Sequence, residues 1–182
     1  AGHRTIKSFL ESLTKKRRKN FRQDRKPFEQ HGGTIERHES PLPGAVAGQM
    51  HDCLMKSAVR NEIKAPYEDV SNNRDAFCQQ NQCALVARVG GKVVGFFSYF
   101  RHGDELLQCH GGFDYEMSTT VKAYHNLMNA SIELAIEEGC SRVSFGPLNN
   151  ETKRRAGTHL RPVTAHLWCS DPVSRFVTRL LF

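Results

Sequence analysis

The first thirty residues carry apolar side chains at a roughly helical spacing, interrupted by a dense basic tract. The apolar positions are Ile6, Phe9, Leu10, Leu13, Phe21 and Phe28. A recurrence of every three or four residues predicts an amphipathic helix. Pro27 lacks the backbone N–H that a helix interior needs and is expected to kink or end the helix, and Gly32-Gly33 is expected to close it. We therefore predict a basic helix in residues 1–33, packed on a single domain that spans residues 34–182.

Two apolar segments, residues 84–89 and 92–100, flank Gly90-Gly91. Two strands joined by a pair of glycines predict a hairpin, because glycine adopts the backbone conformations that a tight turn requires. A second turn leads to another apolar segment at residues 106–113. Residues 83–113 are therefore predicted to form an antiparallel meander of three strands.

The clearest helical pattern spans residues 120–138, and Gly139 supplies a stop signal after it. Further helices are predicted at residues 45–60, 71–80 and 149–156, and from residue 171 towards the end of the chain. Short strands are predicted at residues 34–38, 142–145 and 163–169. The predicted order is therefore helix, strand, two helices, a three-strand meander, the long helix, strand, short helix, strand and a last helix.

Composition and charge restrict the classes of function. With 182 residues, of which 38% are hydrophobic, the chain fits one soluble globular domain, and it has no apolar run long enough to span a membrane. The net charge of +7 favours an anionic partner, such as nucleic acid, a nucleotide or another phosphate-bearing substrate. The N-terminus lacks the apolar core of a signal peptide and is typical of a trimmed end.

The six cysteines form no CxxC pair. A chain of this length does not need disulfides, so we predict a reducing, cytoplasmic location. A zinc site made by Cys78, Cys83, Cys109 and His110 is an alternative, but structural zinc sites generally use more closely spaced pairs. The sequence therefore predicts no metal site.

Three stretches resemble a known family of acyltransferases. They are the basic segment Leu13–Arg22, the helical segments Tyr124–Met128 and Ala135–Gly139, and the C-terminal signature Phe145–Lys153 with Gly157, Arg161-Pro-Val163 and Ala165–Trp168. They are similar to the FemAB-like and CelD-like branch of the GNAT acyltransferases, which includes the peptidoglycan-bridge aminoacyltransferases. The order of the predicted elements is also that of the GNAT fold. The resemblance implies an α/β, acyl-CoA N-acyltransferase-like (GNAT) fold, in which helices flank a mixed, mostly antiparallel sheet.

The resemblance also implies a function, which is the transfer of an aminoacyl group from aminoacyl-tRNA to an amine acceptor. Ordinary GNAT enzymes hold the CoA pyrophosphate on a glycine-rich loop before the long helix. Residues 115–121 occupy that place and contain no glycine. The peptidoglycan-bridge enzymes lack the loop as well, so no cofactor is expected. They usually contain two GNAT units, so this chain is either the C-terminal half of a tandem protein or a minimal version.

Two other functions stay open. One is acyl transfer from acyl-CoA or an acyl carrier protein, and the other is a non-catalytic GNAT-like module that binds RNA or another protein. The missing glycine loop argues against CoA but not against a carrier protein. The sequence identifies neither the acceptor nor the oligomeric state.

Amide formation needs a neutral amine, a stabilised oxyanion and a route for a proton. The resemblance assigns Lys153 as the cationic stabiliser, because the family lysine lies in the same Lys-x-x-x-Gly setting. Asp114 and Glu116 lie between the meander and the long helix and are candidates to deprotonate or orient the amine. The alternatives are a solvated turn for Lys153 and, for the two carboxylates, charges that complement the helix dipole.

Two further groups of residues are candidates for binding. The candidate substrate-binding residues are Tyr115, Tyr124, His125, Asn126 and Arg154. The candidate contacts to the phosphates of tRNA are Lys15, Lys16, Arg17, Arg18, Lys19 and Arg22. Few acidic residues lie nearby in the sequence, although a solvated face is an alternative for such a charge run. No aromatic residues are interleaved for base readout, so any nucleic-acid contact is expected to be sequence-tolerant.

Overall fold

The computed structural model describes residues 5–62, 82–146 and 150–156, and in addition His3, Phe77, Thr158, His159 and Pro162. Apart from Phe77, the helix predicted at residues 71–80 lies outside the described residues. So do Cys78, Gly157, the strand predicted at residues 163–169 and the helix predicted from residue 171. Within the described residues, no helix is both long enough and apolar enough to cross a membrane.

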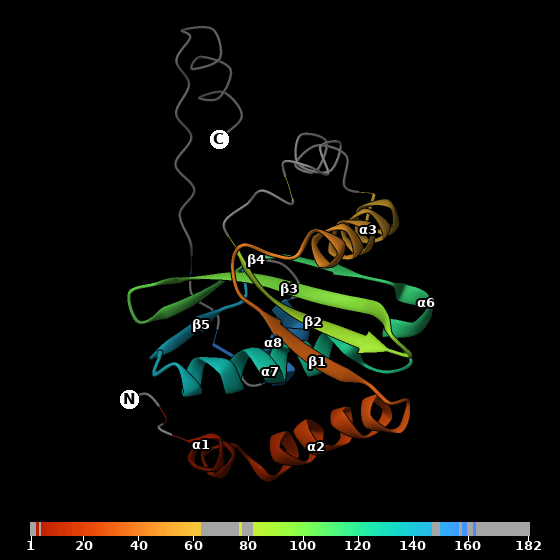
Figure 1. The fold of residues 1–182 in the computed structure, drawn as a ribbon. Coiled ribbons are helices and arrows are strands. Elements are labelled where there is room, and N and C mark those ends of the chain that lie inside the picture. Colours follow the sequence, from red (N-terminus) through yellow and green to blue (C-terminus); the bar gives the residue numbers. More distant parts are fainter. Residues whose placement is uncertain are drawn as a thin grey trace, which may run out of the picture.

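A five-stranded sheet has the strand order β1-β2-β3-β4-β5 (Figure 1). The strands are β1 (Thr34–His38), β2 (Cys83–Val89), β3 (Lys92–His102), β4 (Glu105–Phe113) and β5 (Arg142–Ser144). The first four pair antiparallel, and β5 lies parallel to β4. Gly90 and Gly91, with φ angles of 56° and 78°, form the β2–β3 turn. The predicted meander and the mixed, mostly antiparallel sheet are confirmed.

Helices cover both faces of this sheet (Figure 1). They are α1 (Ile6–Ser12), α2 (Lys15–Gln30), α3 (Gly44–Arg60), α6 (Tyr115–Ser118), α7 (Ala123–Glu137) and α8 (Asn150–Ala156). Helix α3 packs on one face, and α7 packs on the other with α2 beside it. Neighbouring side chains of a strand point to opposite faces, so Phe96 is buried in the core under α3 and Phe97 in the core under α7.

The N-terminal segment differs from the prediction of one continuous helix. It forms α1 and α2, separated at Leu13 and Thr14, where the backbone is extended. Thr14 caps α2 by accepting a hydrogen bond from the backbone N–H of Arg17, and such a cap favours a new helix start. Pro27 lies inside α2, which continues to Gln30, so of the two predicted effects, a kink or an end, the helix end at Pro27 is excluded. Burial of Phe28 in the core compensates for the hydrogen bond that proline removes.

Polar contacts attach α2 to the beginning of α7. The Asn126 side chain is 4% exposed, and its amide nitrogen donates to the backbone carbonyls of Asp24 (2.8 Å) and Lys122 (3.0 Å). The Asp24 carboxylate in turn accepts from the ammonium of Lys122 at 2.7 Å. Lys122 has a φ of 54°, a left-handed conformation that is uncommon outside glycine. These contacts hold the turn between α6 and α7 against α2.

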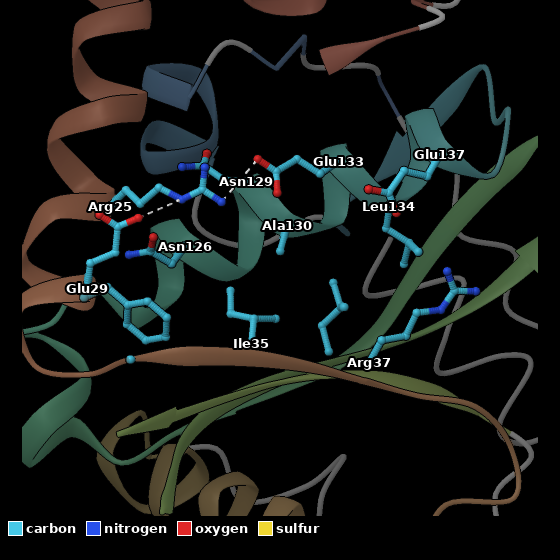
Figure 2. A pocket seen from close by; sticks show the side chains of 13 residues that line it. Arg25, Glu29, Ile35, Arg37, Asn126, Asn129, Ala130, Glu133, Leu134 and Glu137 are labelled. Carbon is cyan, nitrogen blue, oxygen red and sulfur yellow. Dashed lines mark ion pairs between the residues drawn. The ribbon is translucent and has the colours of Figure 1, made fainter. Parts of the chain in front are cut away.

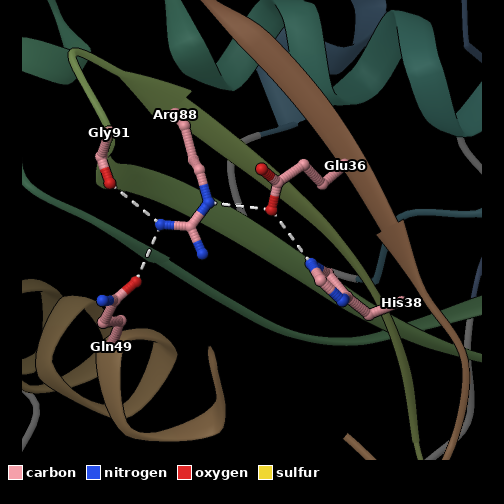
Figure 3. A network of polar contacts seen from close by, with 5 residues as sticks. All are labelled: Glu36, His38, Gln49, Arg88 and Gly91. Carbon is pink, nitrogen blue, oxygen red and sulfur yellow. Dashed lines mark hydrogen bonds and ion pairs between the residues drawn. The ribbon is translucent and has the colours of Figure 1, made fainter. Parts of the chain in front are cut away.

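A second network attaches the edge strand β1 to α3 (Figure 3). The Arg88 guanidinium donates to Glu36 on β1 at 2.8 Å, to Gln49 on α3 at 2.9 Å and to the carbonyl of Gly91 at 3.1 Å. The hydrogen bond from Arg88 lowers the pKa of the Glu36 carboxyl. The hydrogen bond between Glu36 and His38 lowers it further. The network lies at the β1 edge of the sheet, far along the strand order from β5.

Candidate functional site

The two parallel strands β4 and β5 separate after a short paired stretch. They pair only from Glu105↔Arg142 to Leu107↔Ser144. Strand β4 then continues to Phe113, whereas β5 ends at Ser144. We call the place where they separate, at Leu107 and Ser144, the vertex. Beyond this point the backbone groups of β4 on the β5 side have no strand partner within the part of the chain that the structure describes.

A β-bulge lies on β4 immediately beyond the vertex. Phe97 pairs with Gly111 and Tyr99 pairs with Gln108, so Ser98 faces two residues of β4, Cys109 and His110. The Ser98 hydroxyl accepts a hydrogen bond from the backbone N–H of His110 at 3.1 Å. Bulges bend the strand that contains them and redirect its side chains. The bulge therefore marks the point at which β4 leaves its partner.

The other side of the vertex is held by Lys153 on α8. Its side chain is 6% exposed. The ammonium donates to the backbone carbonyls of Phe145 (2.5 Å) and Gly146 (2.9 Å), the two residues that follow β5. Burial lowers the pKa of the Lys153 ammonium from its ordinary value of 10.5. Lys153 thus fixes the turn after β5 and places a buried cation beside it.

Between β4 and α7, residues Tyr115–Ser118 form the short helix α6. Asp114 caps α6, its carboxylate accepting from the backbone N–H of Glu116 at 3.3 Å. The same carboxylate pairs with Lys56 of α3 at 2.5 Å. Glu116 lies exposed in the first turn of α6. Asp114 therefore links α6 to α3, and Glu116 is the more exposed of the two carboxylates.

Three candidate substrate-binding residues lie in an aromatic cluster on α6 and α7. The guanidinium of Arg60 stacks 3.9 Å from the centroid of the Tyr115 ring. Tyr124 is half-buried. The centroid of its ring lies 5.5 Å from that of Phe113 and 5.9 Å from that of His125. The structure thus brings Tyr115, Tyr124 and His125 together. Asn126, by contrast, uses its amide to join α2 to α7.

The basic residues of α2 divide into two groups. Lys15, Lys16, Lys19 and Arg22 are exposed. Arg17 and Arg18 are half-buried, and Arg18 donates to the carbonyls of Glu11 (3.0 Å) and Leu13 (2.6 Å) at the end of α1. Among the described residues, no carboxylate lies within ion-pair distance of any of the six. Helix α2 also packs against α8, which carries the exposed Arg154.

A separate hollow of about 330 Å³ lies between α2, β1 and α7 (Figure 2). Arg25 bridges it from α2 through ion pairs with Glu29 at 3.5 Å and with Glu133 of α7 at 3.6 Å. Burial raises the pKa of the Glu133 carboxyl. Of the predicted site residues, only Asn126 lines this hollow. The hollow lies beside β1, at the opposite edge of the sheet from β5, so the hollow is distinct from the vertex.

A comparison with known protein families found one match. A family profile described as an acetyltransferase (GNAT) domain matches residues 15–154. The chain belongs to the GNAT acetyltransferase family. A search of curated proteins found no match.

Solved structures with the same fold include two kinds of protein. A domain of a lysylphosphatidylglycerol synthetase from Agrobacterium fabrum has a TM-score of 0.58 at 13% identity, over 81% of this chain and 48% of that one. The L-PGS structure from Bacillus licheniformis has a TM-score of 0.58 at 16% identity, over 78% and 46%. An aminoglycoside acetyltransferase from an uncultured soil sample has a TM-score of 0.53 at 15% identity, over 79% and 98%. The chain thus spans about half the length of the first two.

Sequence reasoning did not foresee the bulge or the contacts of Lys153. The pairing of Ser98 with both Cys109 and His110 depends on the register between two strands, which the alternation of apolar residues does not encode. Asp114 was singled out for its position, and its contact with Lys56 joins residues that are far apart in the sequence. The acidic pair Asp114 and Glu116, which favours a helix start, was the available signal for α6.

Proposed function

We propose that this GNAT domain transfers an aminoacyl group from aminoacyl-tRNA to an amine acceptor and forms an amide bond. The observation that carries the proposal is the helical turn α6, with its two carboxylates, between β4 and α7. This segment corresponds to the glycine-rich loop of CoA-dependent GNAT enzymes. Family membership supports the transferase class. The charge and the backbone conformation of α6 help to decide which acyl donor the domain uses.

The α6 turn is poorly suited to a pyrophosphate. A phosphate site at a helix start needs free backbone N–H groups and a favourable local charge. At α6 the Glu116 N–H is already bonded to the Asp114 carboxylate. Asp114 and Glu116 also bring two negative charges to this end of the helix, and Lys56 offsets one of them. A donor that binds its phosphates elsewhere fits this arrangement better than CoA.

The exposed basic residues of α2 provide such a place. Lys15, Lys16, Lys19 and Arg22 lie in the first half of α2, and the described residues offer them no carboxylate partner. Neutralising RNA phosphates releases bound counterions and gives sequence-tolerant affinity. Contact between α2 and α8 joins this basic face to the helix that carries Lys153. The name of the neighbour from Agrobacterium fabrum, a lysylphosphatidylglycerol synthetase, also suggests an amino acid as the transferred group.

The proposed reaction uses Lys153 and Glu116. The amine nitrogen attacks the ester carbonyl that joins the amino acid to the tRNA ribose, a C–N bond forms and the C–O bond to the ribose breaks. An ammonium has three N–H donors, and the described contacts of Lys153 use two of them. The third donates to the developing oxyanion. Glu116 accepts the amine proton and returns it to the ribose oxygen, which leaves as a hydroxyl.

A second candidate is acyl transfer from acyl-CoA or an acyl carrier protein. Membership of a family described as acetyltransferases favours it, as does the likeness in fold to an aminoglycoside acetyltransferase. A carrier protein presents its acyl chain on one phosphopantetheine arm and does not need a pyrophosphate loop. The third alternative, a non-catalytic module that binds RNA or protein, predicts tRNA binding without any amide product.

Native mass spectrometry of the full chain with each donor in turn distinguishes the aminoacyl-tRNA donor from acyl-CoA, and the appearance of an amide product distinguishes transfer from binding alone. We expect a complex with charged tRNA and none with CoA or acetyl-CoA at micromolar concentration, because the α6 turn lacks a phosphate-binding loop. Uncharged tRNA serves as the control for binding to the RNA body alone. A stable complex with acetyl-CoA but not with charged tRNA would instead support the acyl-CoA candidate.

A further inference from the structure

Gln108 occupies the first position of β4 beyond the vertex. The last residue of β4 that pairs with β5 is Leu107, and the bulge at Cys109 and His110 follows Gln108 directly. On its other side Gln108 pairs with Tyr99 of β3. Its side chain therefore lies where the two parallel strands begin to diverge.

The Gln108 side chain extends along β4 towards the diverging part of the strand. Its amide nitrogen lies 3.5 Å from the position that a Cβ of Gly111 would occupy. The same Cβ would lie 2.9 Å from the ring of Phe97, which belongs to the core under α7. The amide is thus on the α7 face of the sheet, past the last residue that β5 pairs with.

The amide oxygen of Gln108 is buried and has no hydrogen-bond partner among the described residues. A buried acceptor without a partner destabilises a folded protein, because it has lost its hydrogen bond to water. Native proteins satisfy most such groups, and an exception calls for an explanation such as a functional role. The hydroxyl of Tyr99, which pairs with Gln108 across β3 and β4, is likewise buried without a partner among the described residues.

We propose that Gln108 accepts a hydrogen bond from the amino group of the transferred aminoacyl group and so determines the acyl specificity of the enzyme. This inference rests on the proposed aminoacyl transfer. The amino group of an α-aminoacyl donor is attached one carbon from the reacting carbonyl, and a simple acyl group such as propionyl has only a C–H bond there. When propionyl occupies the site, the Gln108 oxygen stays unpaired.

Such a site discriminates strongly, because an acyl group without the amino group leaves the buried Gln108 oxygen without a hydrogen bond. A site built to hydrogen-bond a substrate N–H or O–H rejects an analogue without it far better than an apolar pocket rejects a missing methylene. The discrimination is specific to the acyl group and independent of the carrier. Gln108 therefore complements α2, which we propose recognises the tRNA phosphates.

A matched pair of stable donor analogues tests the inference. The probes are an acceptor-stem RNA whose 3′ end carries alanine in amide linkage and the same RNA with a propionyl amide, since they differ only in the amino group. We expect the wild type to bind the alanyl probe about 10- to 100-fold more tightly, as one lost buried hydrogen bond implies. Gln108→Met should bind both probes with the affinity that the wild type shows for propionyl.

Two further variants separate this role from a structural one. Gln108→Glu keeps acceptor oxygens at the same position and should retain the alanyl preference. Gln30→Met, at the exposed end of α2, is the control for a glutamine-to-methionine change and should retain it as well. The melting temperature of Gln108→Met should equal or exceed that of the wild type, because the change removes an unpaired buried acceptor.

Two results would overturn the inference while leaving aminoacyl transfer intact. They are equal affinity of the wild type for both probes, and an alanyl preference in Gln108→Met that matches the wild type. Failure of the wild type to bind either probe would contradict the proposed tRNA donor itself, and the inference with it. A marked fall in the melting temperature of Gln108→Met would identify Gln108 as a structural residue.

Discussion

Replacing Lys153 with methionine is expected to lower the turnover number about 100- to 1,000-fold, the usual effect of removing one donor to an oxyanion. Methionine keeps most of the apolar stem of lysine and removes only the ammonium. The loss should appear mainly in kcat, because the oxyanion forms after the substrate is bound. An unchanged kcat in Lys153→Met would remove Lys153 from the mechanism.

The contacts of Lys153 require a control for stability. Methionine leaves the carbonyls of Phe145 and Gly146 without their donor, which is expected to cost about 1–3 kcal/mol of the free energy of unfolding. Circular dichroism at the assay temperature shows whether the variant is folded. Lys92→Met, at the exposed start of β3, controls for the loss of one positive charge and should keep full activity.

The pH dependence of the rate gives a second test of Lys153. The ammonium form stabilises the oxyanion, so the rate contribution of Lys153 is present below its pKa and is lost as pH rises through it. Burial lowers the pKa of Lys153 below 10.5, so the loss should begin at a lower pH than for an exposed lysine. In Lys153→Arg the side chain stays charged over this range. The ratio of wild-type to Lys153→Arg rates should therefore fall as pH rises.

Changing Lys15, Lys19 and Arg22 together to glutamine is expected to weaken tRNA binding by at least about 10-fold. It should also make the dependence of log K on log salt shallower by about three, close to one for each lost phosphate contact. Arg18 is excluded from this variant because it holds the end of α1. Glutamine is a good helix former, so α2 should remain folded. A gel-shift titration with bulk tRNA at two salt concentrations measures both effects.

A triple variant of equal charge controls for the change in net charge. Lys92, Arg101 and Arg142 are exposed on β3 and β5, away from α2. Their replacement by glutamine should change the affinity and the salt slope only slightly, because exposed charges farther apart than about 10 Å are largely screened at 0.1 M salt. If both triple variants bind tRNA with the wild-type affinity and slope, the basic face of α2 has no role in binding the donor.

The local patterns predicted the fold better than they predicted the site. Gly90-Gly91 and the apolar segments on either side predict the β2–β3 hairpin, because turn geometry and side-chain alternation are local properties. The end of α1 depends on Arg18, whose guanidinium reaches back to carbonyls in the preceding helix. Side-chain contacts of this kind do not follow from the hydrophobic period, which is why one continuous helix was predicted.

The site depends on contacts between distant parts of the chain. Lys153 was identified by resemblance, but its pairing with the carbonyls after β5 arises from the packing of α8. Asp114 was predicted as a base from its position alone, whereas its partner Lys56 comes from α3. Gln108 carries no signal in the sequence. It becomes conspicuous only when the register with β3 and β5 shows that it lies at the vertex.

A transfer assay with competing donors tests the central claim most directly. The full chain is incubated with bulk tRNA carrying a mixture of radiolabelled amino acids, with acetyl-CoA carrying a different label, and with a panel of amines that includes lysine-containing peptides and aminosugars. The account predicts that amino acid label moves from tRNA into an amide product that withstands alkali, while the acetyl label stays on CoA. Acetylation of the same amines, with the amino acids left on tRNA, would contradict it.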